Sequence, residues 1–219
     1  MRNIFSLFGN RKIANLLKIV LRRLSFGIGI LVILWQPADA IVWGEPDDAN
    51  RYPHVGAVIN GNYLCSGFLL SPRVFVTAAH CVVHAVDLRL SVVFGQDLAA
   101  PDAISAGFPL VHPDFAGRAK GPDVAVIQLL TPVFRPHYGR LPGPGLLNHE
   151  APARGALLNG AFTTVGYGRQ YVLAEPEADA KRHVGHVLLA GRSDGLYAEI
   201  SPVSVSGGPC HGDSGGPVF

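Results

Sequence analysis

The chain has 219 residues, of which 48% are hydrophobic and only 16% are charged, a balance that excludes an intrinsically disordered protein. Its 26 glycines and 17 prolines would interrupt long helices, which argues against a coiled coil or a helical bundle. The formal net charge is +2, but residues 41–219 carry 12 basic and 15 acidic groups, so this part of the chain offers no basic surface for nucleic acid. The length suits one large domain or two small ones.

Residues 1–40 have the pattern of a secretory signal peptide. Six basic residues end at Arg23, the stretch 24–35 is uncharged and mostly apolar, and small residues lead to Ala40. A membrane-spanning helix needs about 20 apolar residues, so an uncleaved membrane anchor is the weaker alternative. We therefore expect a secreted protein, extracellular or periplasmic, that begins at Ile41 and has no stable association with the membrane after signal cleavage.

Short apolar segments bounded by Gly, Pro, Asn or Asp follow one another from Ile41 onward, and each is typical of a β-strand. The predicted strands are 54–59, 63–70, 74–77, 88–94, 124–129, 162–167, 183–189 and 196–200. No window of a dozen residues shows a helical period, which predicts an all-β protein, either a sandwich or barrels. Residues 135–145, rich in Gly and Pro, are the best candidate for a linker between two halves.

The serine in the segment 207–217 has the surroundings of a nucleophile. Glycines near Ser214 let the backbone turn sharply, and amide groups in such a turn can converge on one point, as an oxyanion requires. The run 212–216 also fits the G-x-S-x-G pattern of α/β-hydrolases, but that fold needs its acid and its histidine after the serine. Only five residues follow Ser214, so we expect its partners upstream.

Upstream, His80 ends an apolar strand among small residues, and Asp123 stands at the start of another apolar strand. A carboxylate in such a place is costly to bury unless it is paired. A hydrogen bond to His80 would offset that cost and orient the imidazole for taking the proton of Ser214. The expected order along the chain is therefore histidine, aspartate, serine.

Several segments, taken together, resemble the trypsin/chymotrypsin-like serine proteases. The cysteine and histidine blocks of that family resemble Tyr63–Leu70 and Val74–Cys81, its aspartate block Asp123–Leu129, its serine block Gly212–Pro217, and two lesser landmarks Val111–Phe115 and Val165–Gly168. The matches follow the order of the family from Ile41 to Phe219.

The resemblance implies an all-β fold of two six-stranded antiparallel β-barrels. Residues 41–219 would form the protease domain, with the first barrel over about 41–140 and the second over about 146–219. The implied activity is that of a serine endopeptidase, a hydrolase that cleaves protein or peptide substrates through an acyl-enzyme in the cleft between the barrels. No cofactor is implied, and no oligomeric state is predicted.

The same resemblance assigns roles to single residues. His80 would be the general base, Asp123 would orient it, and Ser214 would be the nucleophile. The amides of Gly212 and Ser214 would form the oxyanion hole.

Further roles follow from the same comparison with the family. Cys65 and Cys81 would form a disulfide beside the histidine. Signal cleavage before Ile41 would itself create the α-ammonium that pairs with Asp213 and activates the enzyme. Gly208 corresponds to the floor of the specificity pocket and carries no acid there, so apolar or small substrate side chains are expected.

Members of the family continue past the position of Phe219 with a further strand, a cysteine and a terminal helix. Cys210 resembles the cysteine that pairs there. We therefore expect a C-terminally truncated member, either a fragment or a natural truncation, with an incomplete second barrel. Such a chain is expected to fold poorly and to be weakly active or inactive.

A metal site is not expected. Residues three apart on a strand face opposite sides, which argues against joint chelation by His183 and His186, and the spacing of His80, Cys81 and His84 does not suit a structural zinc site. Other titratable side chains are expected on the surface or in turns, namely His54, His112, His137, His149, Asp47 and Asp48. His211 would either touch substrate or face solvent.

Two alternative functions share these sequence features. One is a secreted, non-catalytic binding module built on a protease-like scaffold, and the other is an esterase that uses the same triad. The intact His80, Asp123 and Ser214 favour the protease over the binding module.

Overall fold

A computed structural model describes residues 44–61, 63–85, 89–118, 121–143, 161–168, 180–193, 197–200 and 208–219. For Ala161, 189–193 and 197–200 it describes the backbone alone. All of these residues belong to one compact unit, Ala38–Phe219. The signal-peptide prediction for residues 1–40 and Ile41 itself lie outside the described residues.

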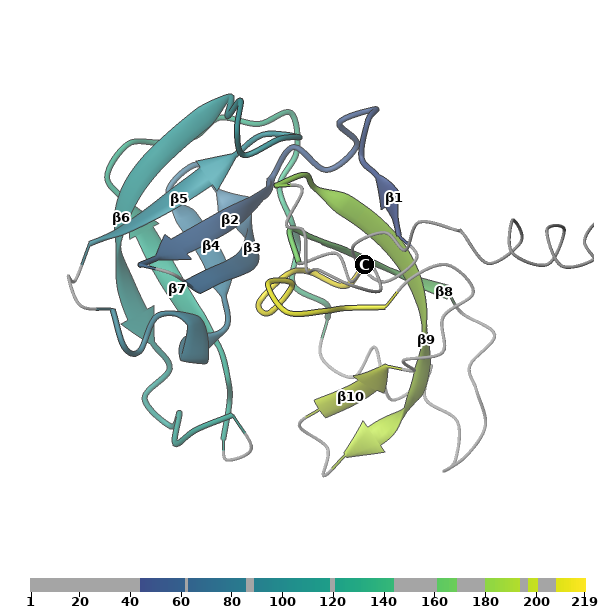
Figure 1. Cartoon of the computed structure of the whole chain (residues 1–219). Helices are drawn as coiled ribbons and strands as arrows, with labels where there is room; N and C mark the ends of the chain where they lie inside the picture. The colour runs from purple at the N-terminus through teal and green to yellow at the C-terminus, as the bar shows by residue number, and fades with distance from the viewer. Residues whose placement is uncertain are drawn as a thin grey trace, which may run out of the picture. The chain divides into compact units, whose positions relative to one another are not determined.

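The first half of this unit is a closed antiparallel barrel (Figure 1), in which the strands follow the order β2-β3-β4-β7-β6-β5. These strands are β2 (Val55–Asn60), β3 (Tyr63–Ser71), β4 (Val74–Thr77), β5 (Leu90–Phe94), β6 (Ala103–Val111) and β7 (Ala125–Leu129). Closure leaves no unpaired strand edge in this half.

Alternating side chains fill the interior of the barrel. In β7 the residues Ala125, Ile127 and Leu129 are buried, and the residues between them point outward. Phe75 and Phe94 meet edge to face inside, with ring centroids 5.7 Å apart. Each fully buried side chain of this size contributes about 1.5–3 kcal/mol of hydrophobic stabilisation.

The described part of the second half is a four-stranded sheet. Its central strand, β9 (His183–Ser193), pairs antiparallel with β1 (Glu45–Pro46), β8 (Ala161–Gly166) and β10 (Tyr197–Ile200). Together with the barrel, this sheet confirms the all-β, trypsin-like fold class. Among the described residues, no helix has the length and apolar character needed to cross a membrane.

Each of the eight predicted strands corresponds to an observed strand, with small shifts at the ends, but two observed strands were not predicted. β1 has only two residues, too few to show a pattern. β6 contains Gly107 and Pro109, which normally interrupt strands. A Cβ on Gly107 would lie 2.5 Å from Cγ2 of Ile127, so this glycine permits the close approach of β6 to β7.

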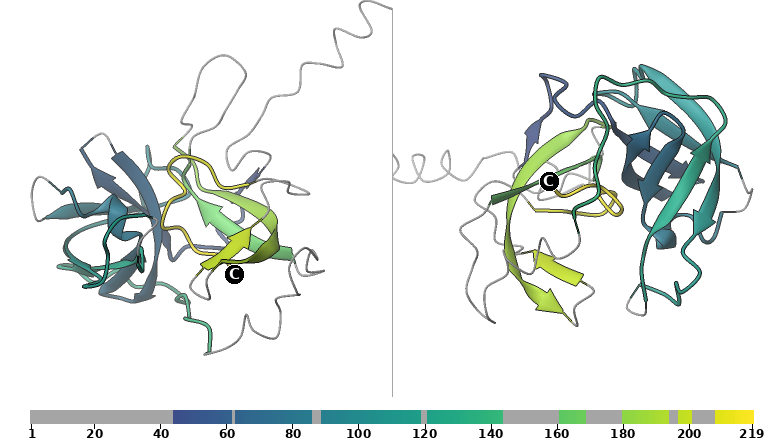
Figure 2. Two further views of the ribbon diagram at one scale, coloured as in Figure 1. Left: turned by 90° about the horizontal axis from the view of Figure 1, so that it is seen from below. Right: turned by 180° about the vertical axis from the view of Figure 1, so that it is seen from behind.

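The C-terminal segment 208–219 contacts both halves of the unit (Figures 1 and 2). On the barrel side, the amide of Ser66 donates to the carbonyl of Ser214 at 2.9 Å. On the sheet side, Phe219 and Thr163 exchange two backbone hydrogen bonds, both of 2.8 Å. The segment that carries the predicted nucleophile is therefore held against β3 and β8.

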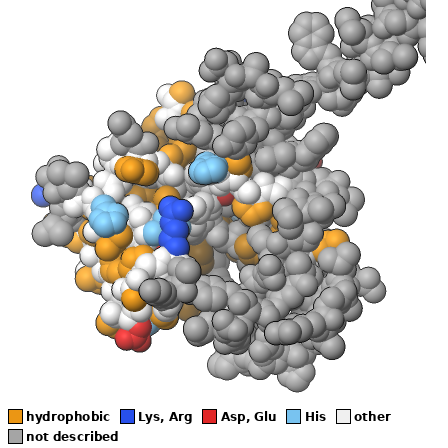
Figure 3. Space-filling view, turned by 60° about the horizontal axis from the view of Figure 1, so that its bottom comes forward, with side chains coloured by type: hydrophobic (Ala, Val, Ile, Leu, Met, Phe, Trp, Pro, Cys, Tyr) orange, Lys and Arg blue, Asp and Glu red, His pale blue; other side chains and the backbone are white. Residues whose placement is uncertain are grey.

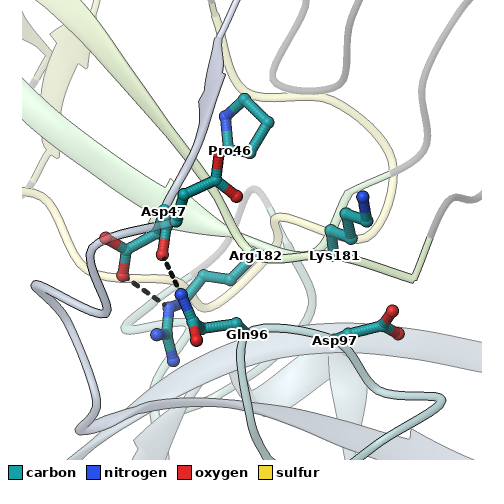
Figure 4. A pocket seen from close by; sticks show the side chains of 7 residues that line it. Pro46, Asp47, Gln96, Asp97, Lys181 and Arg182 are labelled. Atoms are coloured by element: carbon teal, nitrogen blue, oxygen red, sulfur yellow. Dashed lines mark hydrogen bonds and ion pairs between the residues drawn. The ribbon is translucent and has the colours of Figure 1, made fainter.

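Asp47 begins a turn, as expected, since its carbonyl accepts from the amide of Asn50, but its side chain also forms a buried ion pair that was not predicted. The carboxylate of Asp47 and the guanidinium of Arg182 are both inaccessible to solvent and lie 2.9 Å apart (Figure 4). The remaining guanidinium donors reach Asn50 and the carbonyls of Val55 and Gly95. Sequence spacing gave no sign of this pair because 135 residues separate its members.

Arg182→Met is expected to lower the free energy of unfolding by about 3–5 kcal/mol, because it leaves the carboxylate of Asp47 buried without a cation. Urea unfolding measures this loss. The control is Arg51→Met, which removes a half-exposed arginine from the same carboxylate and should cost at most about 1 kcal/mol. Equal losses in the two variants would show that burial of the pair is unimportant.

His54 lies in the turn before β2, as expected of a surface or turn residue, but its side chain is buried, which was not predicted. Neither ring nitrogen has a hydrogen-bond partner among the described residues. The ring packs against Tyr52, His137 and Phe219. Burial, together with His137 and Arg182, lowers the pKa of His54 from 6.5 to about 4.

This low pKa predicts an acid-sensitive fold. In the unfolded chain the imidazole of His54 binds a proton below pH 6.5, whereas in the folded chain it does so only below about pH 4. The free energy of unfolding therefore decreases as the pH falls from 6.5 to about 4. Between pH 7 and pH 5 the urea midpoint is expected to decrease less in His54→Phe than in the parent. The control His186→Phe, at an exposed site, should show the same decrease as the parent. If the urea midpoint of His54→Phe decreases with pH as much as that of the parent, His54 is not the cause of the acid sensitivity.

Candidate active site

His80 and Asp123 lie side by side at one end of the barrel. His80 is in the short 3₁₀ helix η1 (Ala79–Cys81), which begins two positions after the end of β4, and Asp123 lies two positions before the start of β7, the partner of β4. Because β4 and β7 are antiparallel neighbours, the end of one strand meets the start of the other. The pairing of the strands therefore brings together two residues that are 43 positions apart.

The carboxylate of Asp123 holds His80 at two points. Nδ1 of the imidazole lies 2.6 Å from Oδ2, and the backbone amide of His80 donates to Oδ1 at 2.9 Å. Both side chains are largely buried. A carboxylate that accepts the Nδ1 proton leaves Nε2 with its lone pair free, which is the tautomer a general base requires.

Nε2 of His80 is buried and has no hydrogen-bond partner among the described residues. The hydroxyl of Ser214 is therefore not bonded to the imidazole in this structure, although the backbone of Ser214 is close by. The sulfur of Cys81 lies 3.7 Å from the carbonyl oxygen of Ser214. Catalytic hydrogen bonds are often long or absent without substrate and tighten when substrate binds.

The serine loop, residues 210–216, approaches the barrel so closely that one position excludes any side chain. Gly215 has φ +82°, and a Cβ there would lie 2.4 Å from Oγ1 of Thr77 and 2.5 Å from the amide nitrogen of Ala78. These atoms belong to the segment that leads into His80. Glycine at position 215 thus lets the loop of Ser214 reach the histidine.

The predicted disulfide between Cys65 and Cys81 is present. It ties β3 to η1 next to His80 and closes a loop whose ends are 16 residues apart, for which a stabilisation of about 3 kcal/mol is expected. Cys210 is a free thiol in this structure, and burial raises its pKa.

Asp213, next to the serine, is buried and has no cationic partner among the described residues. Its carboxylate accepts hydrogen bonds from the amides of Gly168 and Cys210, at 2.8 and 2.9 Å. Burial nevertheless raises its pKa from 3.8 to about 6, and the two amides offset only part of this effect. The predicted partner Ile41 lies outside the described residues.

The other residues considered in the sequence analysis differ in their exposure to solvent. Gly208 is buried, and Gly212 is half-buried with φ +105°. His211 is exposed. His183 is buried while His186 is exposed, as expected for residues three apart on a strand.

One group of metal-ligand atoms occurs among the described residues. Ligand atoms of Cys65, His80 and Cys81 lie within 4.8 Å of one another. Both sulfurs are bonded to each other in the disulfide, and Nδ1 of the histidine is engaged by Asp123. The donors present here therefore do not suit a metal ion, which would need thiolates.

Two buried hydroxyl groups near the serine loop were not predicted from the sequence. Ser66 hydrogen-bonds to Gly212 and to Tyr167, and Thr77 donates to the carbonyl of Ser66. The only signal in the sequence is a polar side chain within an otherwise apolar strand, and that signal does not name the partner.

The face shown in Figure 3 carries apolar and uncharged side chains over much of the described surface, with charged groups in small patches. Such a surface offers a ligand mainly apolar contacts and backbone hydrogen bonds.

Comparisons with known proteins agree with this geometry. The trypsin family model matches residues 41–219. A trypsin of Saccharopolyspora erythraea is 30% identical over 195 residues, which cover 81% of this chain and 81% of the relative. Brachyurin of Leptuca pugilator is 29% identical over 81% of this chain and 80% of its own length, and serine protease SP24D of Anopheles gambiae is 30% identical over 82% and 67%. The chain therefore belongs to the trypsin family and is a serine-type endopeptidase.

Proposed function

We propose that this protein is a secreted endopeptidase that hydrolyses peptide bonds through an acyl-enzyme on Ser214. The observation that carries the proposal is the pairing of His80 with Asp123 at 2.6 Å, with Nε2 of the imidazole left free beside the serine loop. His80 takes the proton of the Ser214 hydroxyl as the hydroxyl attacks the scissile carbonyl. The same imidazole then protonates the leaving amine and activates the water that releases the acyl group.

Asp123 acts through His80. Its bonds to Nδ1 and to the backbone amide hold the ring in one orientation and stabilise the imidazolium that forms during the reaction. The negative charge on the carbonyl oxygen of the substrate is stabilised by the amides of Gly212 and Ser214. The positive φ of Gly212 supports this role, since it turns the backbone in a way few other residues allow.

The proposed substrate is a protein or a peptide. The names of the relatives, trypsin and serine protease, support this proposal. Gly208 is proposed as the floor of the pocket that binds the side chain before the cleaved bond. A floor without an acid leaves a lysine or arginine side chain unpaired, so the preference is for apolar or small side chains.

Residues 41–140 and 146–219 are proposed as the two barrel domains of the mature enzyme, and residues 1–40 as the signal for secretion. The described strands β2 to β7 fall within the first of these ranges and β8 to β10 within the second, while β1 lies in the first range but pairs with β9 of the second. The disulfide supports an oxidising destination, because such bonds persist outside the reducing cytosol.

Ser214→Ala in the complete gene product is expected to lower kcat by about 10⁴–10⁶-fold, because it removes the nucleophile while leaving substrate binding intact. Steady-state cleavage of a peptide substrate measures the loss. An active-site-directed fluorophosphonate should label the parent at residue 214 and leave the variant unlabelled.

The control for this experiment is Ser91→Ala, which changes an exposed serine on β5 and should alter neither rate nor labelling. Near-parent activity in Ser214→Ala would show that another residue is the nucleophile. Labelling with ester hydrolysis but no cleavage of peptides would identify an esterase, and no labelling of the parent would identify a binding module.

Activation is proposed to depend on an ion pair between the α-ammonium of Ile41 and Asp213. Burial raises the pKa of the Asp213 carboxylate to about 6, and none of the residues that the structure describes places a cation beside it. An ammonium at this place would stabilise the charged form and lower that pKa. The pair would then hold the serine loop in its active arrangement.

One added alanine before Ile41 is expected to reduce activity at least tenfold, since the displaced ammonium no longer reaches Asp213. In the properly processed enzyme, activity should fall as the pH rises through the pKa of the amine, which is about 8 in model peptides and is raised by the pair. The pH–rate profile measures both effects, with the exposed-site variant Asp48→Asn as control. An unchanged profile after the addition would refute the pair.

A further inference from the structure

Ser66 occupies a position that the proposed mechanism has not used. It lies in β3 between the disulfide cysteine Cys65 and Gly67, and its side chain is completely buried. β3 is the barrel strand that faces the serine loop in Figure 1, and the amide of Ser66 donates to the carbonyl of Ser214. Both the backbone and the side chain of Ser66 therefore contact the site.

The hydroxyl of Ser66 joins two segments that are distant in the sequence. Oγ donates to the carbonyl of Gly212 at 2.9 Å and accepts the amide proton of Tyr167 at 2.9 Å. A hydroxyl has one proton to donate, and here that proton goes to the serine loop. Because the group is buried, no water competes for these two bonds.

The hydroxyl of Ser66 and the buried carboxylate of Asp213 both accept hydrogen bonds from the same short segment after β8. The consecutive amides of Tyr167 and Gly168 donate to Oγ of Ser66 and to Oδ1 of Asp213 respectively. A Cβ on Gly166 would lie 2.2 Å from Oδ1 of Asp213 and 2.9 Å from Oγ of Ser66, so both groups pack against this glycine. The segment Tyr167–Gly168, directly after β8, thus donates hydrogen bonds both to the serine loop and to Ser66.

Two carbonyls of the serine loop are therefore directed at one residue of β3. The carbonyl of Gly212 meets the hydroxyl of Ser66, and the carbonyl of Ser214 meets its amide. The carbonyl of Gly212 belongs to the peptide group between Gly212 and Asp213, and the carbonyl of Ser214 belongs to the peptide group between Ser214 and Gly215. Fixing these two carbonyls therefore restrains two planar peptide groups, one on each side of the 213–214 peptide group. The amide of Ser214 lies in the peptide group between these two, and the amide of Gly212 lies in the group that precedes them, so the restrained groups limit how far either amide can turn.

We propose that Ser66 is a positioning residue for the reaction: its buried hydroxyl bridges the amide of Tyr167 and the carbonyl of Gly212 and so holds the serine loop in the geometry in which the amides of Gly212 and Ser214 face the developing oxyanion. This assignment rests on the proposed function of Ser214. Ser66 acts through the loop and does not touch substrate.

The chain offers a matched control in Ser105 of β6. That residue is 2% exposed, donates to the carbonyl of Thr131 at 2.8 Å and accepts its amide at 3.2 Å. Like Ser66, it is a buried serine that bridges a carbonyl and an amide from another segment. Its bonds lie within the barrel and make no contact with the serine loop.

The experiment compares Ser66→Ala with Ser105→Ala in the complete gene product processed to Ile41. Rates are normalised to titrated active sites, so that unfolded protein does not count. Ser66→Ala is expected to lower kcat by about tenfold or more with KM within about twofold, because loop displacement weakens transition-state contacts and spares ground-state binding. Ser105→Ala should leave both constants unchanged, and Ser66→Thr, which keeps the hydroxyl, should retain most of the activity.

An unchanged kcat in Ser66→Ala would overturn the proposal, and so would equal losses of kcat in Ser66→Ala and Ser105→Ala. If Ser66→Ala does not fold, Ser66→Gly deletes the same hydroxyl, and an unchanged kcat in that variant is equally decisive.

Hydrogen exchange separates this inference from the proposed function, since it needs no catalysis. The peptide covering residues 208–216 should exchange faster in Ser66→Ala than in the parent and in Ser105→Ala, because the loop has lost its side-chain bond to β3. Equal exchange in all three proteins would overturn the anchoring role. If the parent shows neither fluorophosphonate labelling nor peptide cleavage, the proposed function fails, and the exchange result still decides whether Ser66 holds the loop.

Discussion

The close contact between the serine loop and the β3–β4 hairpin is the constraint on which the rest of the site depends. Gly215 leaves no space for a Cβ against Thr77 and Ala78, and the amide of Ser66 binds the carbonyl of Ser214. The disulfide secures the same hairpin to η1. A rigid barrel on one side and a tightly packed glycine loop on the other therefore define the space between His80 and Ser214.

Two buried carboxylates in this protein have different environments, and the difference gives them different properties. Asp47 is matched by the guanidinium of Arg182 and by two backbone amides, so its charge is compensated inside the protein. Asp213 receives two amides and no cation from the described residues, and burial raises its pKa to about 6. The first arrangement holds the residue after β1 against the residue before β9, and the same guanidinium reaches the carbonyls of Val55 and Gly95 on the barrel side.

Much of the fold could be predicted from local patterns, because most strands are short apolar segments bounded by glycine, proline, asparagine or aspartate. The exceptions have physical causes. β6 was missed because Gly107 and Pro109 obscure its pattern, although Gly107 is needed where the strand approaches Ile127. His54 and Asp47 lie in turns, as expected, but the burial of their side chains was not predicted, because it is produced by residues far away in the chain, such as His137 and Arg182.

By itself the sequence determined the fold class, the order of the histidine, aspartate and serine blocks, and the family, since these are carried by residue types and local spacing. Only the tertiary structure decided which groups touch. It paired Asp123 with both Nδ1 and the amide of His80, buried Asp47 against Arg182, and placed the hydroxyl of Ser66 between two distant backbone groups. Such contacts arise from strand pairing and packing across more than 40 positions, and no local pattern in the chain encodes them.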